Sequence, residues 1–313
     1  MPPHPDPFFL QVGSGAPGLR FALHHVPPGA VRGLVVQAHA FAEEMNKSRR
    51  MAALQSRAMA AAGFAVLQID LAGCGDSGGD FGDATWAQWV ADIVHGCRWL
   101  RQWHARHGAD GDPTPLWLWG QRAGALLAVQ AAQQLAEPCH LLLWHPATAG
   151  KTVLQQFLRL KAAADLASGQ GKAEMQRLRA ELAAGRAIEV AGYTLHPALC
   201  SGLEQATLQP PATAAGRVEW IEVSPQDDAA LSPAATSHAE RWTRAGWAVR
   251  AQLVQGPAFW QTTEIEDAQA LLPASVAALQ HAAAGSQGVD SPGLKNWPCA
   301  KEPTVIDSRG AVP

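Results

Sequence analysis

Short apolar runs alternate with longer amphipathic stretches along most of the chain. Three runs, "GLVVQAHAF", "FAVLQIDL" and "HLLLWHP", are nearly continuous in apolar residues, which is typical of strands that are buried on both faces of a parallel sheet. Between them, residues 46–62 carry apolar side chains along one side and end at Gly63, a pattern that predicts a helix with a glycine stop. The regular alternation predicts parallel βα units.

The same patterns divide the chain into four segments. The predicted core strands are "RFALHHV", the three runs above, "PLWLWG", "RVEWIEVS" and "VRAQLVQG", and the predicted helices cover residues 46–62, 84–107, 123–136, 234–245 and 264–283. Residues 151–216 instead begin with two successive amphipathic helices and lack a clear buried strand. We therefore expect a first core part at 1–150, a helical cap at 151–216, a second core part at 217–284 and a poorly ordered tail at 285–313.

Composition excludes several classes of protein. The formal net charge of the 313 residues is -3, and their 24 Lys and Arg form no basic block, so nucleic acid is not an expected partner. Five cysteines without a CxxC pair argue against a disulfide framework and a metal site, and they favour a reducing cytoplasm. No apolar run reaches the roughly 18 residues of a membrane helix, and the amino end lacks the features of a signal peptide. No cofactor is indicated either.

Longer blocks carry a resemblance to known proteins. Residues from about 19 to 283 resemble the α/β-hydrolase fold, with a mostly parallel, doubly wound sheet and a helical cap. The blocks "FAEEMNKSRRMAALQSRAMAAAGFAVLQIDLAGCGDSGGDFGDATW", "LWLWGQRAGALLA" and "GPAFWQTTEIE" are similar to the second of two hydrolase families associated with exosortase A systems. This resemblance implies a bacterial setting of exopolysaccharide production and an ester or acyl-type hydrolase with a small-molecule, acyl or sugar-derived ligand.

The catalytic triad of that fold is not intact in this sequence. Gly120 to Gly124, "GQRAG", has the form of a GxSxG nucleophile elbow, but Arg122 stands where serine is required. In "GPAFW", Phe259 occupies the place of the histidine, and Trp260, which follows it, is expected to contact a ligand at this site. Loss of the serine or the histidine lowers turnover about a million-fold, so conventional serine hydrolysis is excluded.

The remaining triad parts have candidates. The acid is expected after the first strand that follows the cap, where Asp227 and Asp228 lie in "VSPQDDAALSP". Asp227 is the preferred residue, and a surface turn with two solvated aspartates is the alternative. "HAF", residues 39–41, occupies the place of an oxyanion loop, so the amides of Phe41 and Ala123 are expected to converge beside His39.

The loop after "VLQIDL" offers a different nucleophile. Cys74 lies in the glycine-rich loop after "VLQIDL", and His39 and His145 follow strands that end at the same edge of the sheet. A cysteine and histidine pair could attack an acyl carbon if the thiol is activated, while the alternative is that these histidines have structural roles. In the same loop, "GDSGG" matches the nucleophile motif of chymotrypsin-like proteases, but those are β-barrels, so Ser77 is expected to be structural.

Arg122 itself predicts a partner. A cation at the amino end of a helix is disfavoured by the helix dipole unless an anion is near. Glu43, Glu44, Asp227 and Asp228 follow strands that should end at the same edge, so an internal ion pair is one interpretation. The other is an anion-binding seat formed by Arg122 and the Phe41 and Ala123 amides.

Two functions remain open on the sequence alone. The first is an ester or acyl hydrolase that uses water, or Cys74 with a histidine. The second is an inactive hydrolase-fold protein that binds an anionic ligand in the pocket, or a protein partner through the cap. In the cap, Gln155, Arg159 and Lys161 could face either a pocket or solvent.

Overall fold

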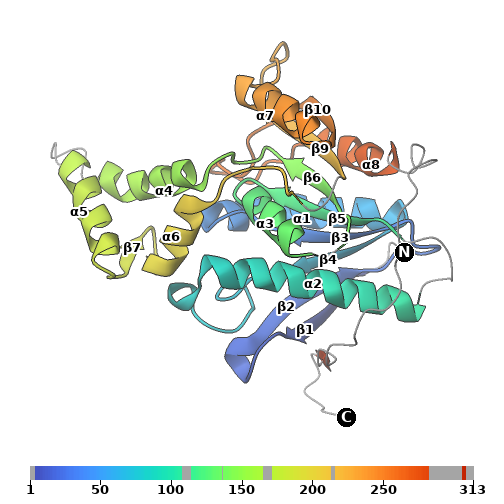
Figure 1. Ribbon diagram of the computed structural model, residues 1–313, viewed down its shortest axis with the longest axis horizontal. Helices are drawn as coiled ribbons and strands as arrows, with labels where there is room; N and C mark the ends of the chain where they lie inside the picture. Colours follow the sequence, from blue (N-terminus) through green and yellow to red (C-terminus); the bar gives the residue numbers. More distant parts are fainter. Residues whose placement is uncertain are drawn as a thin grey trace.

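The computed structural model describes residues 4–107, 114–135, 137–164, 171–212 and 216–281, together with the backbone of 305–307. Its centre is a nine-stranded sheet in the order β10-β9-β6-β5-β3-β4-β2-β1-β11 (Figure 1). The strands are β1 (Asp6–Gln11), β2 (Leu19–His25), β3 (Gly33–Ala38), β4 (Phe64–Ile69), β5 (Leu116–Gln121), β6 (His140–Trp144), β9 (Arg217–Ser224), β10 (Ala248–Gln255) and β11 (Val305–Asp307). From β4 to β10 every neighbouring pair is parallel, whereas β2, β1 and β11 are antiparallel to their neighbours.

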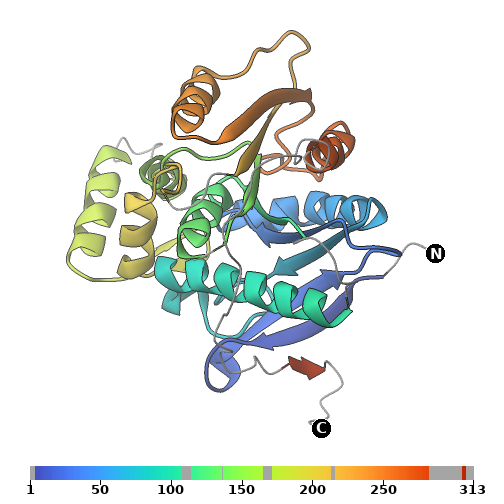
Figure 2. The ribbon, with the colours of Figure 1, turned by 45° about the vertical axis from the view of Figure 1, so that its right-hand side comes forward.

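Helices cover both faces of this sheet. The core helices are α1 (Glu43–Ala61), α2 (Trp86–His107), α3 (Gly124–Gln134), α7 (Pro233–Arg244) and α8 (Leu271–His281). Helices α1 and α8 lie on one face, and α2, α3 and α7 lie on the other (Figure 2). All side chains of β3 and β5 are buried, as the continuous apolar runs predict. This is the predicted α/β-hydrolase fold.

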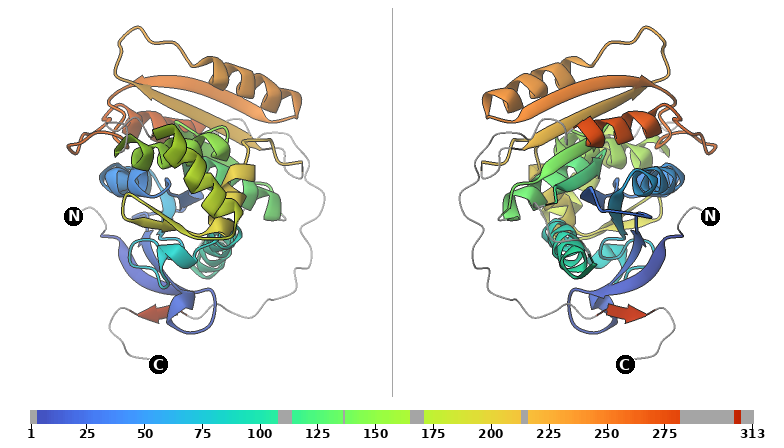
Figure 3. Two further views of the ribbon diagram at one scale, coloured as in Figure 1. Left: turned by 90° about the vertical axis from the view of Figure 1, so that its left-hand side faces the viewer. Right: turned by 90° about the vertical axis from the view of Figure 1, so that its right-hand side faces the viewer.

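Between β6 and β9 the chain leaves the sheet and forms what we call the cap segment, residues 150–212. It contains α4 (Gly150–Ala164), α5 (Gly171–Ala183), a hairpin of β7 (Ile188–Val190) and β8 (Tyr193–Leu195), and α6 (Pro197–Gln205). Figures 1 and 3 show the three helices grouped beside α3, away from β1. The two amphipathic helices were expected from the sequence, whereas α6 and the hairpin were not.

The ends of the sheet differ from the sequence expectation. Strand β1 was not predicted, because "DPFFLQ" shows only a short apolar patch. Most of the expected disordered tail lies outside the described residues, but Val305–Asp307 forms β11 against β1. The pairing of these three residues at the sheet edge needs backbone hydrogen bonds and no apolar pattern.

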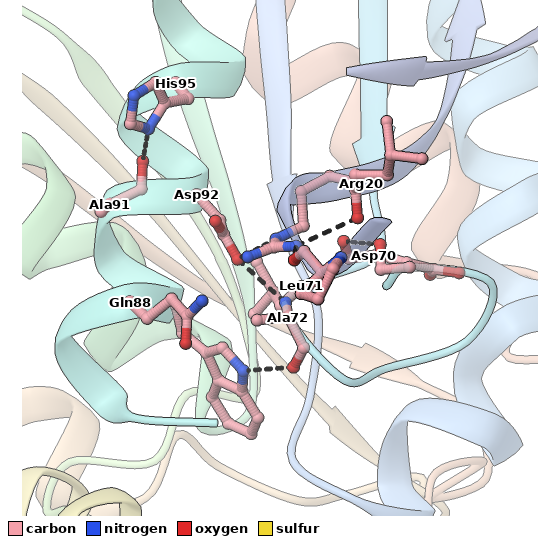
Figure 4. Close-up of polar contacts among 12 residues, drawn as sticks. Arg20, Asp70, Leu71, Ala72, Gln88, Ala91, Asp92 and His95 are labelled. Carbon is pink, nitrogen blue, oxygen red and sulfur yellow. Dashed lines mark hydrogen bonds and ion pairs between the residues drawn. The ribbon is translucent and has the colours of Figure 1, made fainter. Parts of the chain in front are cut away.

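A buried ion pair joins β2 to α2. The Arg20 guanidinium, 1% exposed, donates from Nε to Asp92 Oδ2 at 2.7 Å (Figure 4). The same carboxylate oxygen accepts from the amide of Ala72 at 2.9 Å, which follows β4. Charged groups removed from water require such partners, so this contact fixes the loop that follows β4.

Among the described residues, no helix is both long enough and apolar enough to cross a membrane.

Candidate functional site

The turn between β5 and α3 has the strained geometry of a nucleophile elbow. Arg122, at its centre, has φ 53°, a conformation that non-glycine residues rarely adopt. A Cβ on Gly124 would lie 2.1 Å from the Ala38 carbonyl oxygen, and one on Gly120 would lie 2.5 Å from the Cα of Ala125. Both glycines are therefore required where the helix closes onto the strands, although no hydroxyl stands at the centre of the turn.

The Arg122 side chain is held by groups of its own chain. Its Nη2 and Nε donate to Glu44 Oε1 at 3.2 and 3.3 Å, and Nη1 donates to the carbonyl oxygen of His145 at 3.2 Å. The guanidinium also lies 5.1 Å from the ring centroid of Trp260, a cation–π distance. Of the four carboxylates considered from the sequence, Glu44 is thus the partner of Arg122.

Glu44 occupies the first turn of α1, where the helix dipole favours a negative charge. Burial raises its pKa, and the nearby Arg122 charge and a hydrogen bond with Gln261 oppose that rise. The side chain of Glu43 does not contact Arg122. Its carboxylate accepts hydrogen bonds from Asn46 and from the hydroxyl of Tyr193 in the cap segment. Only one of the two neighbouring glutamates therefore belongs to the elbow.

The two amides expected to form an oxyanion hole are present, and the side chain of Phe41 packs among aromatic rings. Neither the amide of Phe41 nor that of Ala123 is hydrogen-bonded within the part of the chain that the structure describes. The centroid of the Phe41 ring lies 5.2 Å from that of Phe157 of α4 and 6.0 Å from that of Trp89. These rings fill the space between the loop after β3 and the cap segment.

His39 has a structural surrounding. Its Nδ1 lies 2.8 Å from the Ala40 carbonyl oxygen, and its Nε2 accepts weakly from the amide of Leu71 at 3.4 Å. Burial lowers its pKa, so the ring stays neutral. Both nitrogens are used within the fold, which leaves none for an activated nucleophile.

The two residues assigned to the acid and histidine places do not meet Arg122. Asp227 and Asp228 are exposed, and Asp227 accepts a hydrogen bond from Gln255 at the end of β10. Phe259 is buried and packs against Trp144. Phe259 belongs to the core beneath the sheet. The residue of "GPAFW" that contacts the elbow is Trp260, whose ring lies against Arg122.

Cys74 is buried in the loop after β4, and its surroundings disfavour a thiolate. Burial is the main cause that raises the pKa of the Cys74 thiol far above its usual range, and the Asp70 carboxylate adds to it. In the same loop, Ser77 donates to the Asp70 carbonyl oxygen and accepts from the amide of Phe21. The "GDSGG" motif is thus a structural turn, and the Cys74–histidine nucleophile lacks the activation that it needs.

His145, directly after β6, also has a positive φ of 39°. Its Nδ1 accepts from the amide of Val223 at 3.2 Å, so Nε2 carries the proton of the neutral ring. Burial, followed by the charge of Arg122, lowers its pKa to about 4. The ring is therefore a hydrogen-bond donor at neutral pH and a poor base.

Three strained residues mark this edge of the sheet. Four non-glycine residues of the described chain have positive φ, and Ala42, Arg122 and His145 follow β3, β5 and β6 in turn. Such strain persists where the surrounding structure enforces it, and it clusters at functional sites. The backbone at this edge of the sheet therefore has the strained geometry that is typical of a functional site.

A cavity of about 450 Å³ opens beside Arg122 and His145. Its other polar lining residues are Thr148, Thr152, Gln156, Glu222, Ser224, Gln226 and Ser232, and Trp220 lies among its apolar ones. Both oxygens of Glu222 accept from Ser232, at 2.8 Å from the amide and 2.6 Å from the hydroxyl. We call this space the elbow cavity.

Glu222 was not predicted as a site residue. It is one of the two buried carboxylates of "RVEWIEVS", with 7% of its surface exposed, and Glu219 is the other. A charged residue in a strand that should be buried on both faces was the available signal, since such a group needs a partner inside the protein.

The described residues contain no cluster of three or more His, Cys, Asp or Glu side chains that could hold a metal ion.

Known proteins show the same architecture. Residues 29–184, just under half of the chain, match the family described as serine aminopeptidase, S33. Est1E from Butyrivibrio proteoclasticus, solved with ferulic acid bound, superposes with a TM-score of 0.59 at 15% identity over 86% of this chain and 98% of its own. Carboxyl esterase 2 from Tuber melanosporum gives 0.53 at 15% identity over 89% and 84%. No curated protein sequence matches the chain. Together with the strand order and the elbow, these matches show that the chain has the α/β-hydrolase fold.

Proposed function

We propose that this chain is a small-molecule binding protein of the α/β-hydrolase superfamily, without serine-hydrolase activity, and that the elbow cavity is its ligand site. One observation carries the proposal: the strained elbow is kept and opens on a cavity, while its central residue, Arg122, pairs with Glu44. A guanidinium that is already paired offers no attacking atom. Its side chain instead forms a fixed part of the cavity lining, next to the hydrogen-bonding groups of His145, Thr148 and Thr152.

The charges around the cavity favour a neutral, hydroxyl-rich ligand over the anion considered from the sequence. An anion at Arg122 would displace or face Glu44 and would also face the Glu222 carboxylate, and both contacts oppose it. Hydroxyl groups instead suit Glu222, the His145 Nε2–H and the threonines 148 and 152. Trp220 also lies in the lining, but with 2% of its surface exposed it adds little apolar area for a ligand.

A sugar-derived ligand also agrees with the exosortase A resemblance, which implies a bacterial system that produces exopolysaccharide. The cysteine pattern favours a cytoplasmic place for this binding. Ligands of this class would be intermediates of polysaccharide assembly, and a protein partner at the cap segment would be a second, separate association.

Calorimetric titration with neutral monosaccharides and disaccharides, and with the matching sugar acids, tests the proposal. We expect a neutral sugar to bind and its acid form to bind at least ten-fold more weakly. Thr152→Trp, which fills the cavity from α4, should abolish binding. Arg159→Trp places the same ring on an exposed part of that helix outside the cavity and should leave binding unchanged. Preference for the acids, or binding that survives Thr152→Trp, would refute the elbow cavity as this site.

Ester or acyl hydrolysis by water is the second candidate, and two observations favour it. The free amides of Phe41 and Ala123 could stabilise an oxyanion, and Glu44, with its raised pKa, is a carboxylate suited to act as a base. Turnover of short nitrophenyl esters that is lost in Glu44→Gln, with no labelling by a fluorophosphonate, would establish it. Labelling of any serine would contradict both candidates.

A further inference from the structure

A second cavity lies inside the cap segment. Its volume is about 540 Å³, and it is lined by α4, α5 and α6 through Lys151, Leu154, Gln155, Leu158, Arg179, Leu182, Ala183, Pro197, Ala198, Cys200, Ser201 and Glu204. This volume lies within the range of about 300–1,000 Å³ that is typical of small-molecule sites. We call it the cap cavity.

The cap cavity is separate from the elbow cavity. Helix α4 lines the elbow cavity with Thr152 and Gln156, and it lines the cap cavity with Leu154 and Leu158. Within each pair the two residues are four positions apart and so lie on one side of the helix, and the two pairs lie on different sides. The two cavities share no lining residue, so a ligand in one makes no contact with the lining of the other.

The floor of the cap cavity is apolar. Leu154, Leu158 and Cys200 are 5%, 1% and 3% exposed. Burial raises the pKa of the Cys200 thiol to about 12, so the thiol stays protonated and acts as a small apolar group. A hydrocarbon chain placed on this floor would be removed from water at a gain of about 0.8 kcal/mol for each CH₂ group.

The rim carries more positive than negative charge. Lys151 and Arg179, on α4 and α5, are exposed, and neither has an ion-pair or hydrogen-bond partner within the described part of the chain. Among the described lining residues, Glu204 on α6 is the single carboxylate. Two unpaired cations beside an apolar floor complement a ligand with an anionic head and an aliphatic tail.

We propose that the cap cavity binds a medium-chain aliphatic carboxylate, with the tail on the leucine floor and the carboxylate at Lys151 and Arg179. The neighbouring residues 152 and 156 of α4 play no part in this binding, because they face the elbow cavity. The site therefore stands independently of the ligand proposed for the elbow cavity.

Titration of the full chain with decanoate, below the concentration at which it forms micelles, tests the inference. Decanol and decyltrimethylammonium carry the same tail with neutral and cationic heads. We expect decanoate to bind at least ten-fold more tightly than decanol, and the cation to show no binding. Equal binding of decanol and decanoate would overturn the proposal.

Variants locate the site. Lys151→Gln and Arg179→Gln should each weaken decanoate binding about five- to ten-fold, and Ala198→Trp, at an exposed lining position, should abolish it. Arg159→Gln removes an exposed cation from α4 outside the cavity and should change nothing. Thr152→Trp, which closes the elbow cavity, should also leave decanoate binding intact. Decanoate binding that survives Ala198→Trp, or that is lost in Thr152→Trp, would refute the cap cavity as its site.

Discussion

Gly124 shows how closely the elbow is packed. The hydrogen atoms of this glycine face the backbone of the loop after β3, and a Cβ there would lie 2.1 Å from the oxygen of Ala38 and 2.5 Å from that of His39. Neither oxygen belongs to a flexible side chain, so the contact could be relieved only by moving α3 away from β3. The elbow thus depends on this residue independently of any chemistry.

We predict that Gly124→Ala destabilises the fold by about 1–3 kcal/mol, the usual range for overpacking a core. Urea unfolding followed by circular dichroism measures the change. Gly29→Ala is the control, because nothing lies within 4 Å of its Cβ position and a compatible Gly to Ala change is neutral or slightly stabilising. Equal stability of the two variants would show that α3 has room to move.

Arg122 shows what the sequence could and could not predict about single residues. The unfavourable end of the helix dipole predicted an anion beside the guanidinium, and Glu44 is there. The choice between Glu44 and three other carboxylates depended on where two loops place their side chains, which no local pattern encodes. The same limit applies to Trp260: the sequence predicted it as a ligand-contacting residue, but its contact with Arg122 follows from the path of the loop after β10.

At the scale of elements, the buried pair of Arg20 and Asp92 joins a strand to a helix across the core (Figure 4). The pair is charged on both sides, and its removal from water is offset only by the mutual hydrogen bond and the bonds to backbone groups. Removing one partner leaves the other charge uncompensated, whereas removing both leaves none.

Asp92→Ala should therefore lower the free energy of unfolding by about 3–5 kcal/mol, and the double variant Arg20→Leu with Asp92→Leu should recover part of that loss. Chemical denaturation of each variant gives the values. Asp267→Ala, which breaks the exposed pair with Arg50, is the matched control and should cost no more than about 1 kcal/mol. A double variant less stable than Asp92→Ala would contradict this account.

Elements with a strong local signal were predictable, and those without one were not. The parallel strands follow from continuous apolar runs, but β1 and β11 lie at a sheet edge, where backbone pairing needs no such pattern. Helix α8 begins at Leu271 and not near residue 264 as predicted. Pro273 explains the difference, because proline lacks an amide proton and is tolerated in the first turn of a helix but not in its interior.

At the scale of the whole molecule, several buried histidines stay neutral in the folded state. Burial is the main cause that lowers the pKa of His24 to about 3 and those of His140 and His145 to about 4, from the ordinary value of 6.5. The unfolded chain takes up protons on these rings below pH 6.5, and the folded chain does not. Acid therefore favours unfolding.

From this linkage we predict that the stability contributed by these histidines is complete above pH 6.5 and is lost as the pH falls towards 4. Each ring contributes about 1.4 kcal/mol per pH unit over that window. Urea unfolding at pH 7 and pH 5 measures the slope. His24→Leu, which replaces a ring packed between Trp99 and Trp103, should reduce the slope by about that amount, whereas exposed His4→Gln should not. An unchanged slope in His24→Leu would contradict this account. It would mean that His24 is protonated in the folded protein, with water reaching the ring between Trp99 and Trp103.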